Sequence, residues 1–213
     1  MAVLEIRFLS GHYHATAWGR NVNEGEPEWP PAPHRLARAL LDIWYRRHPE
    51  LAENSVKEAL LLLAGQPRMA VPPTTNMAVK LYLDQNKKDS DKQPVLDTFV
   101  CMEKGGRVFI ELPDTAPASA LNTLRTLAEE LNYLGRSESW VAVSVVPDLP
   151  SNPSWNCCAS RAGNIVNTLL SEEEYAELPY LPKTGTKKNT RDCTWLENLV
   201  FSSADLQKDG WNL

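Results

Sequence analysis

Residues 28 to 47, EWPPAPHRLARALLDIWYRR, set the fold of this chain. The stretch begins with three closely spaced prolines, Pro30, Pro31 and Pro33, which neither a helix interior nor a central strand accepts. Pro33 suits the first position of a helix, where its missing N–H has no partner to lose. From Leu36 onward apolar residues recur at helical spacing, and the arginines lie mostly off this stripe. The stretch therefore predicts a proline-rich segment that leads into an amphipathic helix with an arginine-rich outer face.

The composition is that of a globular protein. Of 213 residues, 43% are hydrophobic and 23% are charged, which is enough for one good core, or one core and a smaller appendage. The net charge of −5 argues against a wholly basic nucleic-acid coat protein but leaves room for local basic patches. No apolar run reaches the ~18 residues of a membrane span. We therefore expect no membrane partner. The four cysteines form no Cys-x-x-Cys pair, so we expect no zinc site, and reduced thiols in a cytoplasmic location.

The order of the predicted elements indicates a fold class. Periodicity and turn residues predict four strands, at residues 3–9, 95–102, 107–112 and 139–146. Besides the helix after Pro33, they predict two more helices, at 53–64 and 119–134. The two middle strands flank a glycine-containing turn, so we expect them to form a hairpin. The result is an α+β, ferredoxin-like (RRM-like) βαββαβ domain with an extra helix and both main helices on one face of an antiparallel sheet. RNA-recognition domains share this topology, as do many unrelated proteins.

The domain is expected to end before the composition changes. We assign residues 1–147 to the ferredoxin-like domain, with a long loop at 12–27 after the first strand. Residues 148–213 are rich in proline, asparagine and lysine, and we expect them to form an irregular C-terminal extension or the start of a second domain.

Three short motifs, at this separation, are similar to those of one family. They are GHYHAT at residues 11–16, EWPP at 28–31 and LGRSESW at 134–140, within a resemblance that spans residues 3 to about 146. The chain resembles the CRISPR-associated subunit of the type I-U (now I-G) interference complex, which is a fusion of a Cas five-like and a Cas six-like domain. Members of that family are roughly twice this length, so we expect the chain to correspond to the Cas five-like half, ending at Trp211.

The resemblance implies a prokaryotic, cytoplasmic protein that binds CRISPR RNA (crRNA) without a cofactor. Its Cas five-like half is expected to hold the 5′ handle of the crRNA and to cap the backbone filament of the Cascade complex. The implied partners are a Cas seven-type backbone subunit and a Cas eight-type large subunit, with target DNA met only indirectly. The Cas six-like half is expected to cut the repeat, so we expect this chain to bind RNA rather than to cleave it.

The predicted RNA-binding residues are aromatic or basic side chains in loops and on the first helix. They are His12, Tyr13, His14, Trp18, Arg20, Arg35, Arg38, Arg136, Lys187 and Lys188. Such residues can contact phosphates or stack on bases. Each has a structural alternative: the helix arginines can pair with Glu28 or Asp42, Arg136 can pair with Glu138, and the two lysines can lie in a solvated loop. Trp29, in the proline-rich segment, is more consistent with core packing, whereas Trp18, among polar neighbours, is more consistent with exposure.

Two other functions stay open. RNA cleavage without a metal needs a base and an acid, and His12 and His14 would point the same way if the first strand continued. The alternative function is therefore a metal-independent CRISPR-repeat endoribonuclease that uses these two histidines. They can instead stack on bases or pack beneath the loop. The third function is a protein scaffold that never contacts RNA.

Overall fold

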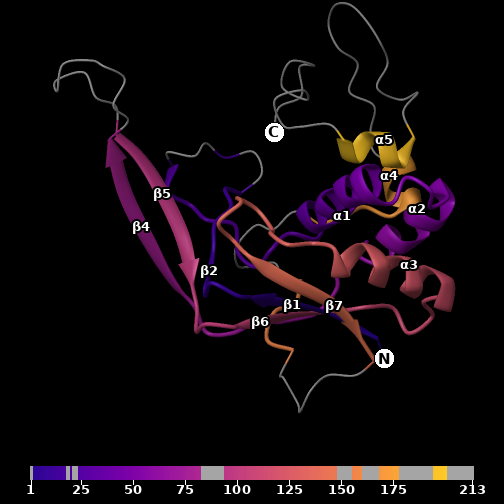
Figure 1. Cartoon of the computed structure of the whole chain (residues 1–213), viewed down its shortest axis with the longest axis horizontal. Coiled ribbons are helices and arrows are strands. Elements are labelled where there is room, and N and C mark those ends of the chain that lie inside the picture. The colour runs from indigo at the N-terminus through magenta and orange to yellow at the C-terminus, as the bar shows by residue number, and fades with distance from the viewer. Residues whose placement is uncertain are drawn as a thin grey trace, which may run out of the picture.

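The structure, a computed structural model, describes residues 2–17, 20, 24–82, 94–147, 155–159, 168–177 and 194–200. Its main sheet has four antiparallel strands in the order β3-β6-β1-β7 (Figure 1). The central strand β1 (Val3–Phe8) pairs with β6 (Arg107–Glu111) and β7 (Val141–Val146), and β3 (Met69–Ala70) extends the other side of β6. This strand order is that of the predicted ferredoxin-like α+β fold, which is confirmed.

Helices α1 (Pro33–Arg47), α2 (Glu53–Leu61) and α3 (Ala118–Glu129) cover one face of this sheet (Figure 1). Alternate residues of β1 and β7 point toward the helices and are buried, as period-two alternation requires. The apolar stripe of α1 packs on them, and Pro33 occupies the start of α1 as predicted. Each fully buried large apolar side chain contributes about 1.5–3 kcal/mol, so this interface is a large stabilising contribution to the fold.

A second sheet forms an arm that projects from the main domain (Figure 1). Its strand order is β2-β5-β4, with β2 (His12–Tyr13) beside β5 (Pro94–Cys101) and β4 (Thr75–Tyr82) at the outer edge. The predicted hairpin between residues 95–102 and 107–112 is wrong, because β5 pairs with β4 and β2 while β6 joins the main sheet. Both strands have strand-forming sequences, and local sequence does not choose between these partners.

The second strand of the ferredoxin-like order is therefore β3, and strands β4 and β5 of the arm are an insertion between β3 and β6. With only two residues, β3 is too short to give a periodic signal. Nearly all of β4 is exposed, whereas β5 contributes the buried Val100 and Thr98 to the protein body. The arm is thus anchored through β5.

Two predicted helices are shorter in the structure. Helix α2 ends at Leu61, before the predicted stop at Gly65. Helix α3 ends at Glu129, and residues 131–134 continue in an extended form whose backbone pairs with residues 139–141. The buried Leu131 and Leu134 fit a helical spacing, but these backbone hydrogen bonds to the next strand replace helical ones.

Parts of the C-terminal 148–213 region add a further layer. Helices α4 (Glu172–Glu177) and α5 (Trp195–Val200) lie beyond α1 and α2 on the side away from the sheet (Figure 1). Leu169 and Trp195 are buried in the same core as α1 and α2, so these segments pack on the ferredoxin-like domain. Among the described residues, no helix combines the length and the apolar character needed to cross a membrane.

Candidate nucleic-acid interface

Glu28, from the proline-rich segment, ties that segment to the first helix. Its buried carboxylate accepts hydrogen bonds from the Tyr13 hydroxyl at 2.7 Å, from Arg35 Nε at 2.8 Å and from the Ala32 backbone N–H at 3.0 Å. Arg35 Nη2 also donates to the Thr16 carbonyl at 2.6 Å. Since α1 has no side-chain hydrogen bond from its own N-cap residue, Glu28 holds the entry to the helix instead.

The electrostatics of this cluster keep each partner in its bonding form. Burial, reinforced by Glu28, raises the pKa of Tyr13 well above its usual range, so the hydroxyl remains a donor. Burial alone would lower the pKa of Arg35, but its hydrogen bonds to Glu28 outweigh this effect and raise it. Of the two alternatives for Arg35, the structure contains the ion pair with Glu28. Contact of Arg35 with RNA stays a prediction.

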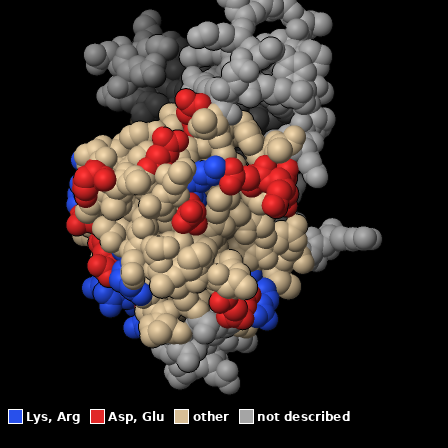
Figure 2. Space-filling view, turned by 90° about the vertical axis from the view of Figure 1, so that its right-hand side faces the viewer, with Lys and Arg blue, Asp and Glu red and all other residues tan. Residues whose placement is uncertain are grey.

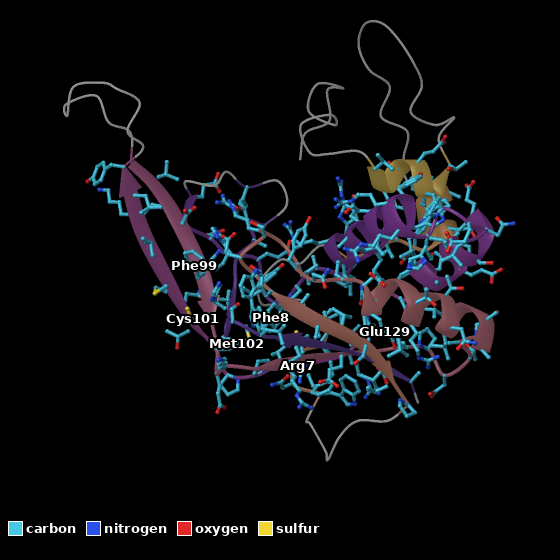
Figure 3. The ribbon with its side chains drawn as sticks, in the orientation of Figure 1. Arg7, Phe8, Phe99, Cys101, Met102 and Glu129 are labelled. Atoms are coloured by element: carbon cyan, nitrogen blue, oxygen red, sulfur yellow. The ribbon has the colours of Figure 1, made fainter. Side chains whose placement is uncertain are left out.

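A second polar cluster surrounds His14, whose side chain is almost fully buried. Its Nδ1 lies 2.5 Å from Glu138 Oε1 and its Nε2 lies 3.7 Å from Asp97 Oδ1. The ring also packs on Phe99, which extends from the side of the arm that faces the main domain (Figure 3). Arg136 donates to the same Asp97 oxygen at 3.3 Å. The ion pair expected between Arg136 and Glu138 is therefore replaced by one with Asp97, while Glu138 bonds His14.

Backbone contacts bring the segment after α3 directly against His14. The N–H of Arg136 donates to the His14 carbonyl at 2.9 Å, and the His14 N–H donates to Ser139 Oγ at 2.8 Å. Gly135 has a φ of +85°, and a Cβ placed there would lie 2.5 Å from the His14 carbonyl oxygen. Only glycine fits this approach.

A groove of about 510 Å³ lies between α1 and residues 130–135. The α1 side chains that line it include four arginines: Arg35, Arg38, Arg46 and Arg47. Arg46 pairs with Asp42, and Arg47 pairs with Glu130 on the opposite wall. Both ion pairs are solvent-exposed, so solvent screens them and they contribute little to stability. The groove therefore presents arginines whose present partners can be exchanged.

His34 also lines this groove. Burial, together with the neighbouring charges of Arg38 and Arg35, lowers the pKa of His34 to about 4. Its imidazole is therefore neutral at pH 7, with one nitrogen that donates and one that accepts a hydrogen bond. Tyr133, from the opposite wall, is 42% exposed.

The other predicted site residues that the structure describes are not part of the groove lining. Arg20 is exposed and pairs with Glu24 at 3.3 Å and Glu26 at 3.6 Å. His12 lies edge-on to Phe99, so His12 and His14 do point to the same side of β2. Trp18, Lys187 and Lys188 lie outside the described residues. Trp29 packs against Phe8 and Tyr13, as its place in the proline-rich segment predicted.

Sequence reasoning recognised the arginine-rich face of α1 but left Arg46, Arg47 and His34 out of the site. The position of these arginines off the apolar stripe already indicated that they face outward. The sequence could not show that residues 130–135, far along the chain, form the opposite wall of the groove. Figure 2 shows the right-hand side of the view in Figure 1, where scattered acidic side chains with a few basic ones leave no continuous basic patch on its described part. In the described part of the chain, no three His, Cys, Asp or Glu residues are grouped to hold a metal ion.

Comparison of the sequence with protein-family models and with curated proteins gives no match. Solved structures that resemble the fold include a CRISPR protein from Archaeoglobus fulgidus, with 16% identity and a TM-score of 0.38 over 68% of this chain and 63% of that chain. They also include a Cas6 from Thermus thermophilus, with 18% identity and a TM-score of 0.32 over 68% and 53% of the two chains. A Cas6 product complex gives 21% identity and a TM-score of 0.33 over 68% and 52%. This chain thus spans 52–63% of the length of these CRISPR proteins, and likeness at this level carries no argument about function.

Proposed function

We propose that this chain is an RNA-binding subunit of a type I CRISPR interference complex, which holds the 5′ handle of the crRNA and caps the backbone filament. The observation that carries the proposal is the groove between α1 and residues 130–135, lined by four arginines. The sequence resemblance to the type I-U (I-G) subunit supports crRNA as the ligand. It also supports the Cas seven-type and Cas eight-type subunits as neighbours in a cytoplasmic complex that meets target DNA indirectly.

The chemistry of the groove suits a phosphate backbone with exposed bases. Arg46 and Arg47 are held only by exposed carboxylates, and an RNA phosphate can take the place of such a partner at small cost. Tyr133 offers a ring on which a base can stack. The neutral His34 can hydrogen-bond a base edge or a ribose 2′-hydroxyl without adding charge. The buried pair of Arg35 with Glu28 fixes the start of the helix that carries these groups.

Binding of labelled repeat RNA, measured in EDTA at several salt concentrations, tests the proposal. We expect a mobility shift that weakens as salt rises, because phosphate contacts release counterions. In the double variant Arg46→Ala/Arg47→Ala, the slope of log affinity against log salt should fall by roughly 0.7 for each phosphate that is no longer bound. Arg125→Ala is the matched control, since Arg125 is an α3 arginine bonded to Asn122 and is not part of the groove. Absence of any shift, or equal losses in the control, contradicts the proposal.

A second function, cleavage of RNA without a metal, has one candidate base in the groove, because His34 lines it. Its imidazole is neutral at pH 7, but a pKa of about 4 makes it a weaker base than a histidine that titrates near neutrality, so this function ranks second. His14 is buried between two carboxylates and faces Phe99, so it has less access to RNA than His34. The same gels, scored for product, separate the two functions. Cut RNA in EDTA that disappears in His34→Ala would establish cleavage, whereas bound and intact RNA supports the handle-binding function.

A further inference from the structure

The face of the main sheet that points away from the helices is covered over only one half. On the covered half, Val3, Ala70 and Phe109 are buried in a small cluster that includes Trp155. The guanidinium of Arg68 lies 5.4 Å from the centre of the Trp155 ring. A segment from beyond the domain thus shields this half from solvent.

The other half carries an exposed tryptophan. Trp140, immediately before β7, is 61% exposed, whereas its neighbours Ser139 and Val141 are buried on the helix side. Alternation therefore places Trp140 on the outer face. Its carbonyl accepts a hydrogen bond from the Leu9 N–H at 2.9 Å, which sets it beside the end of β1, where Leu9 is 38% exposed. The ring of Trp140 is therefore open to solvent, whereas Trp155 packs against the covered half of the same face.

The same half of the sheet carries unbalanced positive charge. Arg7 lies directly opposite Arg107 in the register of β1 and β6, an arrangement of like charges that costs stability. Arg107 is paired with Glu5 at 3.3 Å, but the side chain of Arg7 makes no ion pair or hydrogen bond to any described residue. Figure 3 shows Arg7 on the side of the sheet away from the helices, opposite to Phe8. Arg7 is thus an exposed cation without a charge partner among the residues described here.

We infer that this open half, which we define by Arg7, Leu9, Arg107 and Trp140, binds single-stranded RNA. A base stacks on Trp140, and Arg7 and Arg107 contact the adjoining phosphates. The inference rests on the proposed function and adds a second contact surface for the same RNA. A flat ring beside arginines is the combination that binds splayed single strands, because every base offers a π-face and every nucleotide a phosphate.

The surface and the groove are continuous along one edge of the sheet. Tyr133, which lines the groove, pairs with Trp140 in an isolated antiparallel bridge, and both rings are exposed. An RNA strand that leaves the groove over Tyr133 therefore reaches Trp140 next and Arg7 after it. Arg7 and Arg107 lie side by side in the sheet, and two adjacent positive charges favour a polyanion as the partner. The exposed apolar side chains here are Leu9 and Trp140, a small area for a protein interface.

Fluorescence anisotropy with labelled single-stranded repeat RNA and with an RNA duplex of the same length tests the inference on the full chain. Trp140→Ala should weaken single-strand binding roughly 5- to 150-fold, which corresponds to the loss of one stacked base. Trp140→Phe should retain most of the affinity, because the ring remains. Arg7→Ala should lower the salt slope by roughly 0.7. Duplex binding should change little in the two Trp140 variants, since the bases of a duplex are not available for stacking.

Two variants serve as controls for exposed residues elsewhere. Tyr45→Ala removes an exposed ring from α1, and Arg125→Ala removes an exposed arginine from α3, and both should bind as the wild type does. If wild-type protein binds no RNA, the proposed function and this inference both fail. If wild-type protein binds and Arg46→Ala/Arg47→Ala weakens it while the Trp140 and Arg7 variants do not, only this inference fails. That second result is also the one expected if the surface contacts a protein. Equal losses on single strands and duplexes would overturn the stacking contact.

Discussion

The backbone N–H of Arg136 donates a hydrogen bond of 2.9 Å to the carbonyl oxygen of His14. This bond joins the GHYHAT motif at residues 11–16 to the LGRSESW motif at 134–140, which lie at opposite ends of the domain's sequence. Asp97 of the arm contacts both side chains at the same place. Two of the motifs on which the sequence resemblance rests therefore form one structural unit.

Gly135 should be far more sensitive to substitution than another glycine with positive φ. Gly135→Ala combines left-handed backbone strain with a Cβ 2.5 Å from the His14 carbonyl oxygen, so we expect a loss of more than about 2 kcal/mol in the free energy of unfolding. Gly65→Ala has the same kind of φ, +78°, but nothing within 4 Å of the added Cβ, so it should lose only about 1 kcal/mol. Urea unfolding of both variants measures the difference, and equal losses would show that the contact is not tight.

Removing Arg35 should destabilise the protein more than removing the Tyr13 hydroxyl. Arg35→Ala leaves the buried Glu28 carboxylate without its charge partner, which should cost roughly 2–4 kcal/mol. Tyr13→Phe removes one hydrogen bond while Arg35 and the Ala32 N–H still bond the carboxylate, so roughly 1–2 kcal/mol is expected. Thermal and urea unfolding give both values. The reverse order would mean that the carboxylate reaches solvent when Arg35 is absent.

Thr98→Val should leave the protein as stable or make it more stable. The Thr98 side chain is buried, and its hydroxyl has no hydrogen-bond partner among the described residues. Valine has nearly the same shape and removes a polar group whose burial costs about 1–3 kcal/mol when unpaired. We expect a gain of up to about 1 kcal/mol in urea unfolding. A clear loss would reveal a hydrogen bond to the hydroxyl in solution.

His34 should make stability depend on pH between its two pKa values. The ordinary pKa is 6.5, and burial lowers it to about 4 in the folded protein, so between these values the unfolded chain binds a proton that the folded chain does not. The free energy of unfolding is therefore highest above pH 6.5. It falls by up to about 3 kcal/mol as the pH drops toward 4. Urea unfolding at pH 7, 5.5 and 4.5 measures the fall.

The variant His34→Gln isolates this contribution from that of other titrating groups. It cannot take up the proton, so its stability should fall less with decreasing pH than that of the wild type. Identical profiles for the two proteins would show that His34 is hydrated in the folded state.

The parts of the fold that follow from sequence are those with long periodic patterns. The start of α1 at Pro33 and the strands β1 and β7 were predictable because proline chemistry and alternation act locally. The two-residue β3 was not, and neither was the pairing of β5 with β4, because strand partners are chosen by tertiary contacts. Sequence reasoning therefore found the right topology with the wrong second strand.

The site was less predictable than the fold for the same reason. The pair of Glu28 with Arg35 was foreseen as an alternative because both residues belong to one short stretch. The partners of His14 come from the arm and from the segment after α3, so no local pattern reveals them. The groove could not be predicted because its second wall is residues 130–135. The helical spacing of Leu131 and Leu134 predicted a helix there, whereas α3 ends at Glu129.

The residue pair Val79 and Asp97, which lie opposite each other in β4 and β5, separates the arm into an inner and an outer part. We call this pair the dividing rung. At this rung and toward the main domain, β5 supplies Asp97 and Phe99 to the surroundings of His14. Above it, β4 carries Leu81 and Tyr82, which are 47% and 59% exposed. A chain shortened and rejoined beyond this rung would keep every described contact of His14 and discard the outer apolar surface. The arm is thus separable, by deletion, into a portion that builds the domain and a portion that only extends it.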